Sequence, residues 1–278
     1  MTFLTLCIII GLPTKRKNYK MTMYVITHKQ FNYPLPPHYC PILVGADFNS
    51  NPADYQPDNT GDNISSKNKS YCELTGLYWI WKNTNDDKIG LSHYRRYFSQ
   101  YTNRKGLDLQ VLLTGNPKPI TTSELNKQLT NNDWIVSQPE KSVSDSLKQD
   151  FANYHHVKDL ETTRQVIEEK YPDYLKGFDQ VLNSNRASYY NMFYTRRTEL
   201  NKYCSWLFDI LFDVEKRTDI SNYDQYQQRL FGFLAERLLN VWITATHAKV
   251  TYLAEYQTDI LDRQEVIQKV KQKLKHLL

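Results

Sequence analysis

Two arginines and a histidine lie close together in the stretch His93–Phe98, which reads His-Tyr-Arg-Arg-Tyr-Phe. The apolar run Ile89–Ser92 precedes it and predicts a buried strand. Open α/β sheets bind their ligands at the carboxyl ends of strands, which is where this stretch would lie. The forked guanidinium suits phosphate oxygens, and the flanking aromatic rings offer a flat surface to a sugar or a base. We therefore predict that His93, Arg95 and Arg96 bind a phosphorylated ligand.

The backbone conformation decides whether both arginines reach that ligand. In an extended strand Arg95 and Arg96 would point to opposite faces. One would then meet the ligand, while the other would hold the loop or a neighbouring carboxylate. In a turn both could converge, and a surface ion-pair cluster is the alternative that involves no ligand.

Two further polar groups could carry chemistry. Asp62 and Asn63 follow Gly61 in a long polar loop, where they would contact a ribose, sugar hydroxyls or a metal, or form an Asx-type turn. His155 and His156 could donate to a diphosphate, act as a base or bind a metal. A structural histidine pair is the alternative for these two.

Two acidic residues occur at the spacing of a helix capping box, which gives each of them a possible structural role. Asp224 is a candidate base near a predicted helix start, yet Ser221 and Asp224 also have the spacing of a capping box. The same pattern, Ser70 and Glu73, predicts that Glu73 caps a helix.

Other polar residues fall within predicted elements. Arg229 and Glu236 are seven residues apart on a predicted helix, so they share a face and are expected in ion pairs. Asn191 faces a substrate or belongs to a small packed strand.

The chain has 278 residues, enough for one large α/β domain or two small ones. Its 35 basic and 30 acidic residues leave a net charge of +5. This charge suits anionic small ligands or a lipid surface and is too small to argue for nucleic acid. The four cysteines form no CxxC pair, which predicts reduced, structural thiols in a cytoplasmic protein.

Hydrophobic periodicity predicts strands that alternate with helices, followed by mostly helices beyond residue 145. This order predicts an α/β fold with a mainly parallel sheet, in one domain with a helical C-terminal part. The expected strands cover residues 23–27, 41–45, 88–92, 133–137 and 187–194. The expected helices cover residues 70–82, 159–170, 172–183, 196–215, 223–244 and 262–277, and another begins at Thr121 with Glu124 in a capping box.

The two ends of the chain differ from its body. We expect residues 1–20 to be a non-native or disordered extension, with the true start at Met21 or Met23; a weak membrane anchor is the alternative. Residues 21–258 would form the domain. Residues 259–278 form a basic amphipathic helix, which would lie on an anionic membrane surface or pack against the body.

Several familiar signatures are missing from the sequence. It contains no GxGxxG and no GxxxxGK[ST], so neither the dinucleotide fingerprint nor the P-loop is present. A GxSxG elbow and a D-x-D triplet are also missing.

Three of the motifs together resemble a bacterial family found in capsule and exopolysaccharide gene clusters, domain of unknown function 4422. These motifs are Thr60–Ser65, Tyr71–Trp79 and His93–Phe98. The resemblance spans about residues 23–245 and continues through Asn191–Phe193, Tyr203–Phe208, Asp224, Arg229–Leu234 and Glu236–Leu239.

This resemblance implies a glycosyltransferase with a GT-A-like, Rossmann-related nucleotide-sugar transferase fold over residues 21–258. Members are associated with galactofuranosyl transfer, which implies a UDP-sugar donor, with UDP-galactofuranose favoured. The implied acceptor is a lipid-linked oligosaccharide at the cytoplasmic face of the cell membrane, which the C-terminal helix would contact peripherally. Many enzymes of this fold hold the donor diphosphate through a metal bound by a D-x-D motif. The chain lacks that motif, so no metal ligand is assigned and dependence on Mg²⁺ or Mn²⁺ is left open.

We expect His93, Arg95 and Arg96 to replace the metal by neutralising the leaving diphosphate. The other residues expected to bind the donor are Thr27, His28, Asp62 and Asn63.

Asp224, or His155 and His156, would assist the acceptor hydroxyl, with Asn191 and Tyr78 on the acceptor side. Two alternatives stay open: a glycosyltransferase with another UDP-hexose donor, and a non-catalytic scaffold that binds nucleotide sugars.

Overall fold

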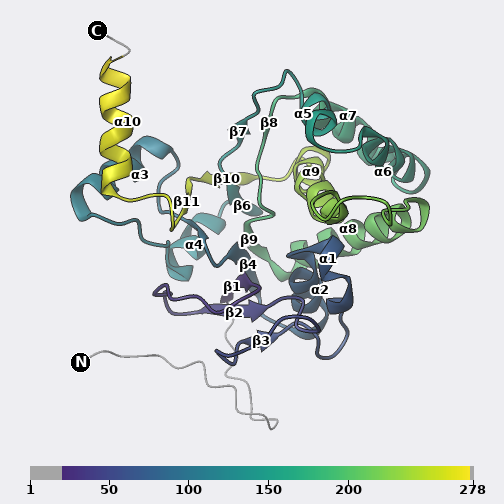
Figure 1. The fold of residues 1–278 in the computed structure, drawn as a ribbon, viewed down its shortest axis with the longest axis horizontal. Helices are drawn as coiled ribbons and strands as arrows, with labels where there is room; N and C mark the ends of the chain where they lie inside the picture. The colour runs from purple at the N-terminus through teal and green to yellow at the C-terminus, as the bar shows by residue number, and fades with distance from the viewer. Residues whose placement is uncertain (1–20, 276–278) are drawn as a thin grey trace.

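The computed structural model describes residues 21–275, so the expectation for residues 1–20 lies outside the described part. A central sheet separates two sets of helices (Figure 1). The sheet has nine strands, seven of them in the order β10-β6-β9-β4-β1-β2-β3, with β5 beside β4 and β11 beside β5. The strands are β1 (Met21–Thr27), β2 (Tyr39–Leu43), β3 (Gln56–Pro57), β4 (Lys88–His93), β5 (Arg96–Phe98), β6 (Trp134–Ser137), β9 (Phe193–Arg196), β10 (Val250–Leu253) and β11 (Glu255–Gln257). Strands β7 (Glu140–Lys141) and β8 (Arg186–Ala187) form a small separate pair.

The sheet is mixed and mostly parallel. Strands β2, β1 and β4 are parallel neighbours, and β6 is parallel to β10. Strand β9 runs antiparallel to both β4 and β6. Since β9 is inserted between them in the reverse direction, β4 and β6 point the same way. The carboxyl ends of β1, β2, β4, β6 and β10 therefore lie on one edge of the sheet, which also holds the start of β9.

Successive side chains of a strand point to opposite faces of the sheet, and each face is packed against its own hydrophobic core. In β1, Tyr24 and Ile26 join the larger core, while Met23 and Val25 join the smaller one on the other face. The larger core is covered by α1 (Asn68–Tyr71), α2 (Leu74–Asn83), α5 (Leu147–Tyr154), α6 (Val157–Lys170), α7 (Leu175–Asn183), α8 (Arg197–Arg217) and α9 (Leu230–Ala245). The smaller core is covered by α3 (Arg104–Thr114), α4 (Thr122–Leu129) and the start of α10 (Arg263–Lys275).

Most of the predicted elements are present. The capping box of Thr121 and Glu124 is confirmed at the start of α4, where each side chain accepts a hydrogen bond from the other residue's backbone nitrogen. The helical second half is also confirmed by α5 to α9. The predictions omitted α3, α5, β3, β5, β7, β10 and β11.

Two predicted helices are wrong in part. The helix expected over 70–82 is interrupted at Cys72, which takes a left-handed φ of 51° between α1 and α2. Ser70 donates to the Lys67 carbonyl instead of capping a helix, so the predicted capping box with Glu73 does not form. The helix expected from residue 223 begins only at Leu230, after the 3₁₀ turn η3 (Gln227–Arg229).

None of the helices within residues 21–275 is long and apolar enough to cross a membrane. Cys72 and Cys204 are free thiols. Helix α10 projects past α3 at one end of the molecule (Figure 1). Val266 in its first turns is buried, while Val270 is exposed.

Candidate active site

The stretch His93–Phe98 lies at the carboxyl edge of the sheet, as predicted. His93 ends β4 and pairs with Arg96 at the start of β5, so Tyr94 and Arg95 form the connecting turn. Arg95 forms an ion pair with Asp259 at 2.9 Å, and both side chains are partly exposed. The Arg96 guanidinium lies 4.3 Å from the centre of the Tyr190 ring. The two arginines therefore diverge, and Arg95 is the one that holds a neighbouring carboxylate.

His93 is held against the backbone of the turn before β9. Its Nε2 lies 2.6 Å from the carbonyl oxygen of Tyr190, so this nitrogen must carry the hydrogen and donate. Burial lowers the pKa of His93 to about 4, against the opposing effect of that hydrogen bond. His93 is thus neutral near pH 7. The positive charge that the sequence assigned to it at a diphosphate is missing, and its contact positions Tyr190.

Thr27 and His28 lie at the same edge, after β1. The Thr27 hydroxyl is buried and donates to the Lys29 carbonyl, which fixes the turn that leaves the strand. The His28 ring meets Tyr94 edge-on at 5.4 Å between centroids. Burial, followed by the charges of Lys29 and Arg95, lowers the pKa of His28. The structure thus brings these two residues to the His93–Phe98 stretch, as predicted.

A carboxylate that sequence analysis had assigned to a helix cap lies beside this stretch. Glu73 precedes α2, and its Oε1 accepts a 2.6 Å hydrogen bond from Asn191 Nδ2. Cys72, Tyr190 and Asn191 all have left-handed backbones, with φ of 51°, 73° and 51°. Such conformations are costly for residues other than glycine and cluster at functional sites. Here they turn Glu73 and Asn191 toward each other across 118 positions of sequence.

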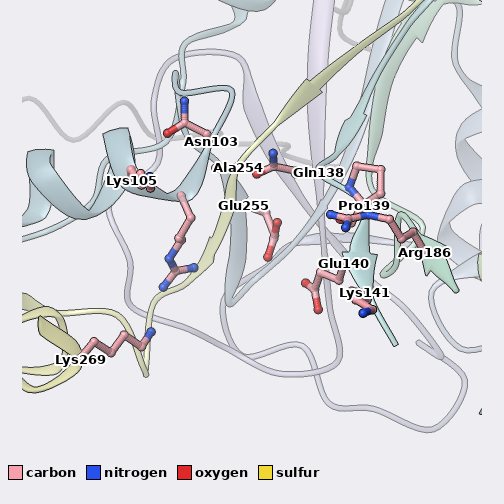
Figure 2. A pocket seen from close by; sticks show the side chains of 11 residues that line it. Asn103, Lys105, Gln138, Pro139, Glu140, Lys141, Arg186, Ala254, Glu255 and Lys269 are labelled. Carbon is pink, nitrogen blue, oxygen red and sulfur yellow. The ribbon is translucent and has the colours of Figure 1, made fainter. Parts of the chain in front are cut away.

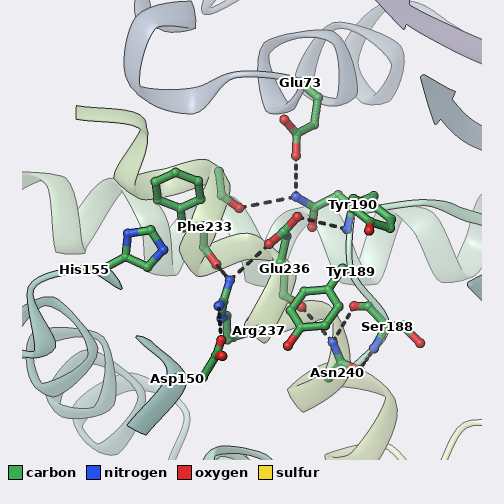
Figure 3. Close-up of polar contacts among 12 residues, drawn as sticks. Glu73, Asp150, His155, Ser188, Tyr189, Tyr190, Phe233, Glu236, Arg237 and Asn240 are labelled. Carbon is green, nitrogen blue, oxygen red and sulfur yellow. Dashed lines mark hydrogen bonds and ion pairs between the residues drawn. The ribbon is translucent and has the colours of Figure 1, made fainter. Parts of the chain in front are cut away.

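A second carboxylate reaches the same turn from α9. Glu236 accepts a 2.9 Å hydrogen bond from the Tyr190 nitrogen and a 3.0 Å bond from Arg237. Figure 3 shows Glu73 and Glu236 approaching Tyr190 from different parts of the chain. Arg237 is itself buried and also contacts Asp150 at 3.5 Å.

Both carboxyl groups are shifted in the direction that suits a base near neutral pH. Burial raises the pKa of Glu73 and also that of Glu236, and the negative charge of Glu73 adds to the rise at Glu236. Both residues remain half-buried, so they are not sealed in the core. A carboxylate with a raised pKa accepts a proton from a reacting group more readily than an ordinary one.

The side-chain amide of Asn191 has one hydrogen-bond acceptor that no described residue satisfies. Its nitrogen donates to Glu73, but its buried oxygen has no hydrogen-bond partner among residues 21–275. Buried polar atoms are normally paired, so this oxygen suits a donor that arrives with a ligand. A sugar with two neighbouring hydroxyls could donate one hydrogen to the Asn191 oxygen and the other to Glu73.

The prediction that Arg229 and Glu236 lie on one helix is wrong, because Arg229 belongs to η3 and α9 begins after it; the expected ion pair is present for Glu236 but not for Arg229 among residues 21–275. The Nε of Arg229 lies 3.4 Å from the Cys72 sulfur, and Glu236 pairs with its neighbour Arg237. The positive charges of Arg229 and Arg96 both act to lower the pKa of Glu73. Glu73 therefore has two positively charged side chains near it.

Two neighbouring hollows lie near this edge. The larger has a volume of about 850 Å³ and lies between the start of α3, the β7–β8 pair, β11 and α10 (Figure 2). The smaller, of about 160 Å³, is lined by Arg96 and Tyr190 among others. Arg104 and Glu255 line both hollows, so the two lie on either side of these side chains.

Asp62, Asn63 and Tyr78 lie elsewhere. Asp62 accepts a hydrogen bond from Tyr78 at 3.2 Å, and its backbone is bonded to Asn83 at the end of α2. Asn63 accepts from Ser65 N and donates to the Gly61 carbonyl, which is the Asx-type turn. Helix α2 leads into the start of β4, so its end marks the opposite edge of the sheet from His93. The structure brings these three residues together, but away from the arginines.

Asp224, His155 and His156 form a further group beside α9. Asp224 accepts a 2.8 Å bond from the Gln227 nitrogen at the start of η3, so it caps that turn. His155 stacks on Phe233 at 4.2 Å and contacts Gln227 at 3.0 Å. His156 lies 4.2 Å from the Tyr223 ring. Their catalytic role stays a prediction.

The part of the chain from residue 21 to 275 contains no group of three or more His, Cys, Asp or Glu side chains that could hold a metal ion. The side chains at the carboxyl ends of β1 and β4 are cationic or neutral, apart from the paired Asp259. These strand-end side chains offer few oxygen ligands to a divalent cation, and the carboxylates of Glu73 and Glu236 lie close to them.

Comparison with known proteins identifies the family of the chain and a similar fold. The model of the family called domain of unknown function DUF4422 matches residues 22–248. The chain belongs to the DUF4422 family. Among solved structures, the fold of this DUF4422 chain is similar to the apo structure of the bifunctional glycosyltransferase WbbM, with a TM-score of 0.77 and 26% identity. The match covers 87% of this chain and 46% of WbbM, so the DUF4422 chain spans about half the length of that protein. No curated protein sequence matches it significantly.

Sequence reasoning singled out the arginines of the DUF4422 chain as candidate site residues and did not include Glu73 or Glu236 among them. Glu73 was assigned to a cap and Glu236 to an ion pair. The one available signal was that both fall inside the long motifs Tyr71–Trp79 and Glu236–Leu239.

Proposed function

We propose that the protein is a glycosyltransferase that moves a sugar from a UDP-sugar to an oligosaccharide acceptor in capsule or exopolysaccharide synthesis. The proposal rests most on one observation. Two carboxyl groups with raised pKa, Glu73 and Glu236, lie beside a cationic strand exit in a chain whose fold resembles a glycosyltransferase. This arrangement suits the two demands of glycosyl transfer, which are a base for the acceptor and positive charge for the leaving group.

The fold supports the same assignment. We propose that residues 21–258 form a GT-A-like domain that binds the nucleotide at the ends of β1 and β4. Thr27 and His28 would line the nucleotide side. The resemblance to the capsule family favours galactofuranose as the sugar and a lipid-linked oligosaccharide at the cytoplasmic membrane face as the acceptor.

Arg96 is the residue we assign to the leaving diphosphate. Among residues 21–275 it forms no ion pair, and it lies over Tyr190 in the lining of the smaller hollow. Arg95 is partly neutralised by Asp259 and would hold the turn. A divalent cation brought in by the diphosphate is the alternative way to balance this charge.

Glu73 is the residue we assign to the acceptor hydroxyl. The reacting hydroxyl would donate to Glu73, and a neighbouring hydroxyl of the same sugar would donate to the unpaired Asn191 oxygen. The oxygen of the reacting hydroxyl attacks the anomeric carbon and the bond from that carbon to the diphosphate oxygen breaks. The hydroxyl proton moves to Glu73, and UDP leaves against Arg96. Direct displacement of this kind inverts the anomeric configuration.

The experiment that tests this function measures UDP release from a panel of UDP-sugars, with and without acceptor. Glu73→Gln should lower kcat by at least about 100-fold and leave UDP affinity unchanged, because it removes a proton acceptor and keeps the shape. Glu168→Gln, at an exposed ion pair, is the matched control. If Asp224→Asn abolishes transfer and Glu73→Gln does not, the base is Asp224.

Two further arms separate the alternatives. A non-catalytic scaffold would bind a UDP-sugar and release no UDP under any condition. Activity that is lost on chelation and restored by Mn²⁺ would overturn the role of Arg96 as the substitute for a metal. Retention of configuration in the product would overturn direct displacement assisted by Glu73.

A further inference from the structure

The larger cleft at the carboxyl edge carries a concentration of positive charge that the chemistry above does not use. Five basic side chains line it against two acidic ones, although the chain as a whole is only mildly basic. The basic residues are Arg104, Lys105, Lys141, Arg186 and Lys269.

Little inside the protein neutralises these cations. Arg104 pairs with Asp108 at 3.0 Å and Lys269 with Glu265 at 2.6 Å, both as helical neighbours at partly exposed positions. Such surface pairs are weak and leave much of the charge effective. Lys105 and Lys141 are exposed, and neither forms an ion pair within residues 21–275.

The acidic residues reduce this charge less than their number implies. Burial raises the pKa of Glu255 to about 7, and the nearby charge of Glu140 contributes to the rise. Figure 2 shows Glu140 and Glu255 facing the same space. Since Glu255 is partly protonated at neutral pH, the cleft is more cationic than the formal charges suggest.

Tyr190 connects the cleft to the reaction centre. Its hydroxyl donates to Glu140 at 3.3 Å, and its ring lies below Arg96. Its backbone contacts Glu236 and His93. A ligand seated in the cleft could therefore extend over an aromatic ring, which suits a sugar, toward Glu73.

The cleft is separate from the place assigned to the nucleotide. The nucleotide side is at β1 and β4, near Thr27 and His28. The cleft lies beyond β9, where β6 and β10 end and β7, β11 and α10 surround it. Its volume of about 850 Å³ is large enough for a phosphate group together with a sugar.

We infer that this cleft binds the phosphate-bearing end of the acceptor, a sugar phosphate or diphosphate, while the sugar to be extended lies over Tyr190. The inference rests on the proposed transferase function, because it names the acceptor's chemistry at the same site. Lys105 and Lys141 would supply the charge that recognises the phosphate.

The test is a calorimetric titration of the full chain with inorganic diphosphate in the presence of saturating UDP, which fills the donor site. Lys105→Ala/Lys141→Ala should raise the Kd for diphosphate at least tenfold and leave the Kd for UDP unchanged. Lys148→Ala/Lys176→Ala removes two exposed lysines from α5 and α7 and should change neither value. Unaltered melting temperatures would establish that the variants are folded.

Each other outcome overturns the inference. These outcomes are no diphosphate binding to the UDP-saturated wild type, equal binding by both double variants, and a parallel loss of UDP affinity. A loss of binding to anionic phospholipid vesicles without a change in diphosphate affinity would make the cleft a membrane-facing surface instead. The two hypotheses fail in different assays. If the protein is not a transferase, no UDP is released from UDP-sugars, but the diphosphate titration still shows whether Lys105 and Lys141 bind phosphate.

Discussion

At the scale of single residues, the two arginines of the central motif have different surroundings. Arg95 is bonded to Asp259 at the rim, whereas Arg96 lies over an aromatic ring without an acidic partner in the described chain. A guanidinium that already holds a carboxylate gains less from a diphosphate than one that does not. The motif as a whole is cationic, but its two charges are not equivalent.

This difference leads to a prediction about UDP affinity. Arg96→Ala should weaken UDP binding by roughly 10- to 100-fold, the range expected for a lost charge-assisted hydrogen bond. Arg95→Ala should have a smaller effect, because its main partner is Asp259. Equilibrium titration with UDP measures both, and Arg164→Ala, at an exposed ion pair, is the control. A larger loss for Arg95→Ala would reverse the assignment.

His93 predicts a pH dependence of stability. Its pKa is about 4 in the folded protein, because burial lowers it from the ordinary 6.5. Between these values the unfolded chain binds a proton that the folded protein does not, so stability falls as the pH drops from 6.5 toward 4. The loss from this group is at most roughly 3 kcal/mol.

A comparison with His93→Gln isolates that contribution. Glutamine retains a donor for the Tyr190 carbonyl and does not titrate. Denaturant unfolding at pH 7 and at pH 4 should show a larger loss of stability for the wild type than for the variant. Glu73 and Glu236, whose raised pKa values act in the opposite direction, are present in both proteins. Equal losses would mean that His93 is protonated in the folded state.

At the scale of elements, the same local sequence pattern has two outcomes. Thr121 and Glu124 form a capping box, while Ser70 and Glu73 do not. The difference comes from contacts outside the local sequence. Cys72 has a left-handed φ that interrupts the helix before Glu73, and the Glu73 side chain accepts a hydrogen bond from the distant Asn191. Sequence periodicity carries information over a few residues, so it predicted α4 and could not predict the break before α2.

This contrast can be measured as free energies of unfolding. Thr121→Ala should destabilise the protein by about 1 kcal/mol, the usual cost of a lost N-cap. Ser70→Ala should cost only a few tenths of a kcal/mol, since Ser70 caps no helix and bonds only to the Lys67 carbonyl. Denaturant titrations of the two variants give the comparison. Similar costs would indicate that Ser70 does stabilise a helix start.

The elements that sequence analysis missed have weak patterns for physical reasons. Helix α3 leaves Leu109 and Leu113 exposed, which blurs its apolar face. Strands β5 and β11 are three residues long and contain the polar residues Arg96, Glu255 and Gln257. These polar residues face the two hollows, so the elements hardest to predict are those that line the site.

At the scale of the whole molecule, the mostly parallel sheet was predictable, and the reversed strand β9 and the residues that meet beside it were not. Alternating apolar strands and helices predicted a mainly parallel sheet, and ligand binding at its carboxyl edge stays a prediction. The site itself joins β4, the segment before α2, the turn before β9 and α9. Glu73, Asn191 and Glu236 meet there only because β9 is inserted in reverse between β4 and β6, a pairing that no local pattern specifies.

Helix α10 extends the molecule beyond this sheet. Its start is fixed to the body by the buried Val266 and by Arg263, which donates to the Leu113 carbonyl at 3.1 Å. Farther along, Val270, Lys271 and Lys275 are exposed. The packing alternative is therefore confirmed for the first turns, while contact of the exposed later turns with a membrane stays a prediction.

The exposed turns of α10 predict binding to an anionic membrane surface. Each lysine near such a surface contributes about 1 kcal/mol, so Lys271→Ala/Lys275→Ala should weaken binding to vesicles containing phosphatidylglycerol by roughly 30-fold. Co-sedimentation at low salt measures the change, and binding should fall as salt rises because these charges are screened. Lys148→Ala/Lys176→Ala, which changes α5 and α7, should bind as the wild type does. Neither α10 lysine lines the basic cleft, so diphosphate affinity should stay constant while vesicle affinity falls. Equal vesicle binding by both double variants would exclude α10 as the membrane contact and leave it as a helix that packs only on α3.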